Sequence, residues 1–383
     1  MKTCVKILSL VLAAVFCVGC LASCGAKNYA ENNTEFFIGG SGPLTGNASS
    51  YGISVNKGAQ IALEEINEAG GLNGIKFKFE MKDDQAETTP AANAYHALYE
   101  AGMQASIVSV TSGSCIEFAD SAQKDGVFAL TPSASDAKVI ATGDHIFRVC
   151  FGDPQQGTIA ADSLTKDFTK IGVVYDTSDT YSSGIYEAFL TEMAKLGKTK
   201  NTDFVETTFD ADNKQNFSTQ ITTLKAAGCD VIFLPIYYTE AGLIAKAAAT
   251  AEYNVPIFGC DGLDGIAGQI DDTVTVAISY ITPFDVNSQD TLIKTFVEKY
   301  QAKYNELPDQ FAADGYDALM AIYAAMKKAD VKDVTISAAD LGKILVDTFT
   351  SSDFSYTGLT GQGMTWAKDG YCEKAPNIVE VVR

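Results

Sequence analysis

The sequence predicts an α/β fold of two similar domains, on three observations. The chain has 383 residues, more than the ~250–300 at which a single hydrophobic core usually stops growing. From Phe36 onward, short apolar runs alternate with helical patterns, which is typical of parallel sheets built from βα units. A similar series of runs then recurs in the second half of the chain, so we expect two related domains.

The N-terminal segment, residues 1–23, has the pattern of a secretion signal. Two lysines precede an apolar run at residues 7–18, which is too short to span a bilayer as a helix of about 20 residues. Residues 21–25, Leu-Ala-Ser-Cys-Gly, resemble a bacterial lipobox. This resemblance implies that Cys24 is lipidated and becomes the first mature residue. An ordinary signal peptide with a chance cysteine and cleavage at Cys20 remain alternatives.

The first half contains four apolar runs that we expect to form strands. They lie at Phe36–Ile38, Phe77–Glu80, Ser106–Val110 and Val127–Leu130. Apolar residues between Ile53 and Ala69 recur at helical spacing and stop at two glycines, which is a typical helix end. A second helical pattern covers Ala91–Ala101. These patterns predict a strand-helix series for the first domain.

The second half repeats this series at offsets of roughly 125 to 135 residues. Its expected strands lie at Ile171–Tyr175, Phe204–Thr207, Val231–Leu234 and Ile257–Phe258, followed by a further run at Val276–Tyr280. Two long helical patterns, Asp290–Tyr304 and Phe311–Lys328, exceed what this half needs. We expect them to return to the first domain, so that several crossings form a hinge with a ligand cleft between the lobes.

Composition excludes several classes of function. The chain carries 28 Lys+Arg against 48 Asp+Glu, a net charge of −20, and no basic block, which argues against nucleic acid and against electrostatic membrane docking. Two histidines leave little room for histidine catalysis or a metal site. The scattered cysteines beyond the signal lack CxxC spacing, so we expect buried free thiols. These are Cys115, Cys150, Cys229, Cys260 and Cys372.

Polar loops follow several expected strands, where open parallel sheets bind their ligands. Thr111–Ser114 and Thr131–Ser135 offer hydroxyl and backbone N–H groups at helix starts, which can hold a carboxylate, although the same residues also favour helix capping. Asp179–Gly184, Pro235–Glu240 and Gly259–Gly262 offer acidic groups for an ammonium and tyrosines for apolar walls. Asp261 is alternatively a residue of an Asp-Gly turn.

Three segments that resemble catalytic motifs do not support catalysis. Residues 197–199, Gly-Lys-Thr, mimic the end of a P-loop but precede a strand instead of following one. Residues 121–124 fit the S-x-x-K pattern of penicillin-recognising enzymes, whose other motifs are missing. The glycine-rich segment 40–46 has its third glycine one place late for a dinucleotide fingerprint, and Pro43 interrupts it.

Six segments, in order along the chain, carry a resemblance to a known family. They are Ser41–Gly46, Tyr51-Gly52, Glu65–Gly71, Asp83-Asp84, Thr131–Ser135 and Phe311–Leu319. Together they resemble the branched-chain amino-acid binding proteins of ABC importers. This resemblance implies the type I periplasmic-binding-protein fold, which consists of two Rossmann-like lobes joined by a hinge of three crossings. The implied division is a tether at residues 24–34, an N-terminal lobe at 35–150 and 282–356, and a C-terminal lobe at 151–281 and 357–383.

The resemblance also implies a set of ligand contacts. Residues of the first lobe that match the family's contacts to the ligand's carboxylate and ammonium groups are Ser112, Ser133, Ala134 and Ser135. Asp261 matches the family's acidic partner of the ammonium, and the side-chain walls match Tyr181, Tyr237, Tyr51 and Phe311. Two departures matter: the family often has glutamate where Asp261 stands, and Thr111–Ser114 is small and polar where side-chain selectivity is set. The amino-acid class is therefore better supported than leucine, isoleucine or valine individually.

The expected function is binding without chemistry. The resemblance implies a monomeric lipoprotein without cofactor or metal, held outside the bacterial membrane by Cys24, that passes an amino acid to an ABC permease and its ATPase. A ligand-sensing receptor of the same fold, a small amide or carboxylate as ligand, and an enzyme are the alternatives.

Overall fold

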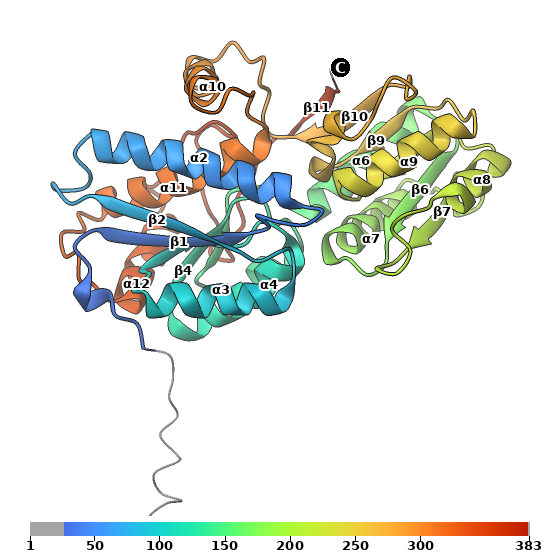
Figure 1. Ribbon diagram of the computed structural model, residues 1–383. Coiled ribbons are helices and arrows are strands. Elements are labelled where there is room, and N and C mark those ends of the chain that lie inside the picture. The colour runs from blue at the N-terminus through green and yellow to red at the C-terminus, as the bar shows by residue number, and fades with distance from the viewer. Residues whose placement is uncertain (1–26, 382–383) are drawn as a thin grey trace, which may run out of the picture.

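The computed structural model describes residues 27–381 and folds them into two α/β lobes (Figure 1). The predicted lipidation site Cys24 lies outside the described residues. Within residues 27–381, no helix combines the length and the apolar character needed to cross a membrane.

The first sheet has five parallel strands in the order β2-β1-β3-β4-β5. Its strands are β1 (Phe36–Gly42), β2 (Phe77–Asp83), β3 (Ala105–Ile107), β4 (Phe128–Thr131) and β5 (Ile146–Arg148). Alternate side chains enter separate cores on its two faces, with Phe36 and Ile38 on one face and Phe37 on the other. The connecting helices are α2 (Ser49–Glu68), α3 (Thr88–Glu100), α4 (Ser112–Asp125) and the short α5 (Ala137–Ala141).

The second sheet has six strands in the order β11-β10-β9-β8-β6-β7, and only β11 runs antiparallel. Its strands are β6 (Ile171–Asp176), β7 (Phe204–Phe209), β8 (Val231–Leu234), β9 (Ile257–Gly259), β10 (Ile278–Thr282) and β11 (Asn377–Glu380). Its helices are α6 (Asp153–Asp167), α7 (Thr180–Lys195), α8 (Ser218–Ala227), α9 (Tyr238–Thr250) and the 3-10 turns η2 (Asp261–Leu263) and η3 (Ile266–Gly268).

The two sheets share one strand order. When β1 to β5 are matched with β6 to β10, both sheets read second-first-third-fourth-fifth. This topology confirms the two related α/β lobes predicted from the spacing of the apolar runs. The strand bounds differ in detail: β3 stops at Ile107, because Val108 to Val110 leave the sheet toward the loop before α4, and β10 begins at Ile278.

The last helices return to the first lobe, as the sequence predicted. They are α10 (Thr291–Tyr304), α11 (Gln310–Lys328) and α12 (Ala338–Phe349). Helix α11 packs directly on α2, because two glycines let the backbones meet. A Cβ at Gly58 would stand 1.8 Å from the Ala312 carbonyl oxygen, and one at Gly315 would stand 2.3 Å from that of Val55. This close approach sets α2 and α11 side by side.

The C-terminal segment crosses between the lobes later than predicted. The predicted boundary placed residues 357–383 in the second lobe, but Asp317 of α11 accepts hydrogen bonds from the Leu359 and Thr360 N–H groups (both 2.8 Å). The Trp366 indole donates to the Arg148 carbonyl oxygen (2.7 Å), which also lies in the first lobe. Only β11 joins the second sheet. These buried polar partners hold residues 357–372 against the first lobe.

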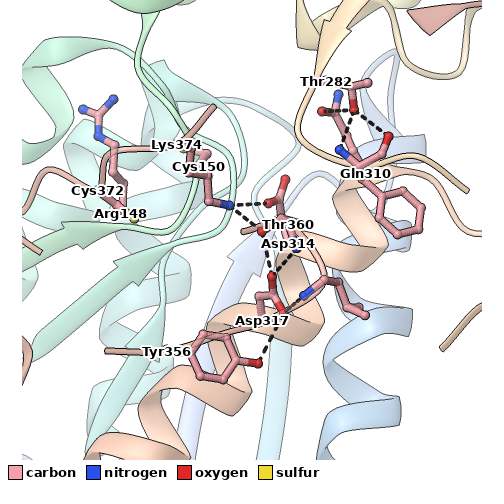
Figure 2. Close-up of polar contacts among 12 residues, drawn as sticks. Arg148, Cys150, Thr282, Gln310, Asp314, Asp317, Tyr356, Thr360, Cys372 and Lys374 are labelled. Atoms are coloured by element: carbon pink, nitrogen blue, oxygen red, sulfur yellow. Dashed lines mark hydrogen bonds and ion pairs between the residues drawn. The ribbon is translucent and has the colours of Figure 1, made fainter. Parts of the chain in front are cut away.

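A buried charged cluster lies where this segment meets α11 (Figure 2). Lys374, 5% exposed, donates to the Thr360 hydroxyl, and its Nζ lies 3.7 Å from Asp314 Oδ1. The Lys374 carbonyl oxygen accepts from the Gln155 side chain of α6 (2.5 Å). Lys374 therefore connects the two lobes: its side chain contacts the first lobe, and its carbonyl oxygen accepts a hydrogen bond from the second.

Candidate functional site

A nearly filled cavity of about 10 Å³ lies between the lobes. Its lining is Tyr51, Val110, Thr111, Ser112, Ser133, Tyr181, Tyr237, Asp261, Gly262 and Phe311. The structure thus brings together seven of the nine side chains that the sequence singled out as ligand contacts. They come from α2, α11 and the loops after β3 and β4 in one lobe, and from α7 and the loops after β8 and β9 in the other. The predicted position of the site, beyond the carboxyl ends of parallel strands, matches this cavity.

Aromatic rings form the walls of the cavity. Tyr51 and Phe311 lie 4.3 Å apart by ring centroids, a contact that follows from the close packing of α2 on α11. From the second lobe, Tyr181 and Tyr237 stack at 5.0 Å with an interplanar angle of 10°. Tyr237 also meets the edge of Tyr51 at 5.6 Å, so the aromatic walls of the two lobes touch.

Tyr51 also links the lobes by hydrogen bonds. Its hydroxyl, on the first lobe, donates to the Gly262 carbonyl oxygen (2.6 Å) and accepts from the Tyr238 N–H (3.0 Å), both on the second. Helix α2 holds the ring by its close packing, and Tyr51 itself is 1% exposed. This geometry places the described structure in a closed arrangement of the two lobes.

Asp261 is the one carboxylate in the lining of the cavity. Its Oδ1 accepts from the Tyr181 hydroxyl (2.6 Å), which itself accepts from the Gly262 N–H (2.9 Å). Burial raises the pKa of Asp261 to about 6, against the opposing effect of the hydrogen bonds from Tyr181 and Gln156. At neutral pH the carboxyl is still mostly ionised, so the site presents a negative charge in a desolvated place. Such a charge favours a cationic ligand group.

Two glutamines hold the backbone around Asp261, and the sequence predicted neither. The Gln156 side-chain oxygen accepts from the Asp261 N–H (3.0 Å), and the Gln310 amide donates to the Asp261 carbonyl oxygen (2.7 Å). Gln156 belongs to the second lobe and Gln310 to the first, at the start of α11. Asp261 is therefore positioned from both lobes. Gln310 stands directly before Phe311 in one of the family-like segments, which is the one signal that could have pointed to it.

A helix N-terminus also lines the cavity. Helix α4 begins at Ser112, after Thr111 at its N-cap, and no side chain caps its first N–H groups. Ser133 lies beside it and donates from its hydroxyl to the Val110 carbonyl oxygen (2.8 Å). Uncapped N–H groups and the positive end of the helix dipole form a site for an anion. The alternative prediction that the serine and threonine residues here serve only to cap the helix is therefore not supported at its first turn.

Ala134 and Ser135 differ from the expectation, because neither lines the cavity. Ala134 is fully buried in the core behind the loop, and its N–H donates to the Thr131 hydroxyl (3.0 Å). The Ser135 carbonyl oxygen accepts from the Arg148 guanidinium (2.5 Å) and from the Asp153 N–H (2.9 Å). Both residues therefore stabilise the loop through contacts outside the cavity.

The remaining predictions on chemistry concern metals and thiols. Residues 27–381 contain no group of three or more His, Cys, Asp or Glu side chains arranged to hold a metal ion. The five cysteines expected to be buried free thiols are free and buried, as predicted. Burial raises the pKa of the Cys115 thiol to about 12, which makes it a poor nucleophile.

The fold and the cavity together define a two-lobe substrate-binding protein. The model of the periplasmic binding protein family matches residues 35–382, so the chain belongs to this family of substrate-binding, not catalytic, proteins. It is 28% identical over 332 residues to a Leu/Ile/Val-binding protein homolog of Brucella melitensis, covering 85% of this chain and 88% of that protein.

Solved structures agree with this family assignment. The branched-chain amino acid transporter substrate-binding protein LivJ of Streptococcus pneumoniae, in complex with isoleucine, has 27% identity and a TM-score of 0.79, covering 91% of this chain and 100% of that one. A leucine-binding protein LivK of Thermotoga maritima has 26% identity and a TM-score of 0.78, covering 89% and 94%. The resemblance noted in the sequence is thereby confirmed at the level of fold and family.

Proposed function

We propose that this protein captures an amino acid with a neutral, branched apolar side chain between its lobes and delivers it to an ABC importer. The observation that carries the proposal is that Asp261 and the α4 N-terminus both line one aromatic cavity. The ammonium of an α-amino acid zwitterion complements Asp261, and its carboxylate complements the α4 N-terminus. The names of the similar proteins favour Leu, Ile or Val as the side chain.

Closure supplies the signal for delivery. The ligand enters the open cleft, contacts both lobes and shifts the hinge toward the closed form by its higher affinity for that form. A membrane permease with its ATPase then recognises the closed protein. We propose that the protein acts as a monomer, carries no cofactor and catalyses no reaction.

A thermal-shift screen of the soluble form, beginning after Cys24, tests the proposal. The ligands are the twenty amino acids, small amides and short carboxylates. A ligand at 100 times its Kd stabilises the folded state by about 2.7 kcal/mol, which raises the melting temperature visibly. We expect shifts with leucine, isoleucine or valine. If only carboxylates or amides raise the melting temperature, the ligand belongs to that alternative class and is not an amino acid.

The affinity for the amino acid is expected to fall in acid. The pKa of Asp261 is raised to about 6 by burial, so below pH 6 its carboxyl is protonated in the free protein. Binding an ammonium then requires removal of that proton, and Kd rises about tenfold per pH unit. Titration calorimetry from pH 5 to pH 8 measures this slope. The Asp261→Asn variant, which cannot titrate there, is the control and should show a flatter profile.

Replacing Tyr51 with Phe is expected to weaken amino-acid binding about 5- to 150-fold. The change leaves the Gly262 carbonyl and Tyr238 N–H without their partner when the lobes close, and unpaired buried groups of this kind cost about 1–3 kcal/mol. Calorimetry on both proteins checks this value. Tyr304→Phe removes a hydroxyl that donates to Lys57 on the surface of the first lobe and should change nothing. Equal affinities for all three proteins would contradict the role of Tyr51 in closure.

We further propose that lipid on Cys24 anchors the protein outside the cell membrane. The lipobox-like segment 21–25 and the polar tether at residues 24–34 support this location. In cells, Cys24→Ser should release the protein into the soluble fraction and abolish incorporation of labelled palmitate, while ligand binding stays unchanged. Labelled Cys24→Ser protein in the membrane fraction would overturn the proposal.

A further inference from the structure

Part of the segment predicted to be a tether is bound to the first lobe. The Asn28 side-chain amide donates to the carbonyl oxygens of Tyr99 (3.0 Å) and Met103 (2.8 Å). Its side-chain oxygen accepts from the N–H of Ala30 (2.9 Å), which begins the single 3-10 turn η1 (Ala30–Asn32). Tyr99 lies in the last turn of α3, where carbonyl groups lack partners within the helix, so Asn28 supplies one of the missing donors.

Asn33 makes a second contact with the same part of the first lobe. Its side-chain amide donates to the Gly102 carbonyl oxygen (2.9 Å). Gly102 has a φ of +94°, and a Cβ there would stand 2.9 Å from the Asn33 side-chain oxygen, so a glycine permits this approach. Between the two asparagines, Ala30 is 2% exposed. Residues 28–33, here called the clasp, are therefore fixed on the turn between α3 and β3.

The clasp lies at the end of the first lobe opposite the aromatic cavity. This cavity lies beyond the carboxyl ends of the parallel strands, whereas the turn from α3 to β3 leads into the amino end of a strand. In Figure 1 the described chain accordingly begins on the side of the first lobe that faces away from the second lobe. The clasp thus leaves the facing surfaces of the lobes free to open and close.

The clasp shortens the connection to the proposed lipid anchor. Asn28 stands four positions after Cys24, and Thr34 stands ten positions after it. Four extended residues reach about 14 Å at most, and ten reach about 35 Å. When lipid holds Cys24 in the bilayer, the clasp therefore keeps this end of the first lobe close to the membrane. The lipid contact rests on the proposed anchor, whereas the clasp itself does not depend on it.

The side chains beside the clasp suit the surface of a bilayer. Tyr29 is 44% exposed, and Nζ of Lys27 lies 4.8 Å from the centre of its ring and 3.3 Å from a Glu31 carboxylate oxygen. Tyrosine rings settle at the headgroup level of membranes, and lysine keeps its ammonium in water while its stem covers apolar surface. We infer that the clasp holds the Tyr99–Met103 end of the first lobe against the lipid surface, with the cleft away from it.

Hydrogen exchange of the mature chain tests the clasp. The Ala30 and Asn33 N–H groups are bound within it, the second to the Ala30 carbonyl oxygen (2.9 Å). In the double variant Asn28→Ala/Asn33→Ala we expect amides of residues 28–34 to exchange at least about tenfold faster than in the wild type. Asn32→Ala, at an exposed position of η1, is the matched control and should exchange as the wild type does. Thermal unfolding checks that each variant keeps its fold.

Energy transfer to a labelled lipid tests the orientation of the lipidated protein on vesicles. A donor dye is attached to Glu100→Cys, at the end of α3, or to Lys195→Cys, at the end of α7 in the second lobe, both exposed positions. The native thiols Cys115, Cys150, Cys229, Cys260 and Cys372 are buried, so the dye goes to the introduced cysteine. We expect more transfer from position 100 than from position 195, and a smaller difference in the double variant.

Faster exchange in the double variant, together with a reduced difference between the two dye positions, supports the proposal. Equal exchange in the wild type and the double variant overturns the clasp. Equal transfer from both positions of the anchored wild type overturns the contact with the lipid surface. If the wild type stays in the soluble fraction, the proposed anchor fails and the lipid contact fails with it, while the exchange result still decides the clasp.

Discussion

The Asp261→Ala variant is expected to fold normally and to bind its amino acid about 2–5 kcal/mol more weakly than the wild type, which is roughly 30- to 5,000-fold in Kd. Asp261 is 5% exposed and is the one carboxylate in the lining of the aromatic cavity. An ammonium brought into this cavity loses its hydration, and without the carboxylate it meets no opposite charge there. Titration calorimetry at pH 7.5 measures the loss.

Folding should be preserved, because Asp261 owes its raised pKa to burial and its charge is not matched by a cation in the unliganded protein. An uncompensated buried charge is itself costly, so its removal relieves that cost. The exposed Asp212, changed to Ala, is the control and should bind as the wild type does. Unchanged affinity in Asp261→Ala would remove this residue from the ammonium site. A partial recovery in Asp261→Glu would support the charge as the cause.

The Asp317→Ala variant is expected to lose about 3 kcal/mol or more of folding stability in the first lobe, because it leaves several buried donors without their acceptor, each at a cost of about 1–3 kcal/mol. Asp317 accepts from Leu359 and from both the N–H and the hydroxyl of Thr360, and Tyr356 donates to it at 3.3 Å (Figure 2). Lys374 lies in the same buried cluster and donates to the Thr360 hydroxyl. The variant frees the segment that carries Lys374.

Urea unfolding measures this effect, with fluorescence as the probe. The protein has a single tryptophan, Trp366, which is 5% exposed and lies within the segment that Asp317 holds. Its signal therefore reports on this region directly. Asp347→Ala, at an exposed position of α12, should stay within about 0.5 kcal/mol of the wild type. Identical midpoints for Asp317→Ala and the wild type would show that the cluster does not hold the segment.

Much of the fold follows from the sequence because the apolar runs of the sheets are local and repeated. The sequence did not predict β5 and β11, because strands of three and four residues are too short to give a recognisable apolar pattern. The boundary at residue 357 was wrong for another reason. Residues 357–372 are held by Arg148 and Asp317, which are distant in sequence, and no local pattern records such partners.

Some residues of the candidate site could be predicted from the sequence, and others could not. Tyr181, Tyr237 and Asp261 follow strand ends, so the topology of the sheet and the family-like segments pointed to them. Gln156 and Gln310 lie in helices and contact Asp261 across 105 and 49 residues, which periodicity cannot reveal. Of the loop after β4, Ser133 lines the cavity, whereas Ala134 and Ser135 do not. Arg148, which is distant in sequence, donates from its guanidinium to the Ser135 carbonyl oxygen, and no local pattern records such a contact.

The central claim is that one cleft binds both charged ends of an amino acid. Titration calorimetry with leucine, or the best neutral amino acid of the screen, against its des-amino acid and its decarboxylated amine tests it most directly. We predict that the amino acid binds one to one and that both analogues bind at least about 30-fold more weakly, since each lacks one of the two charges. A des-amino acid that binds as tightly as the amino acid would contradict the assignment of Asp261 and the amino-acid class together.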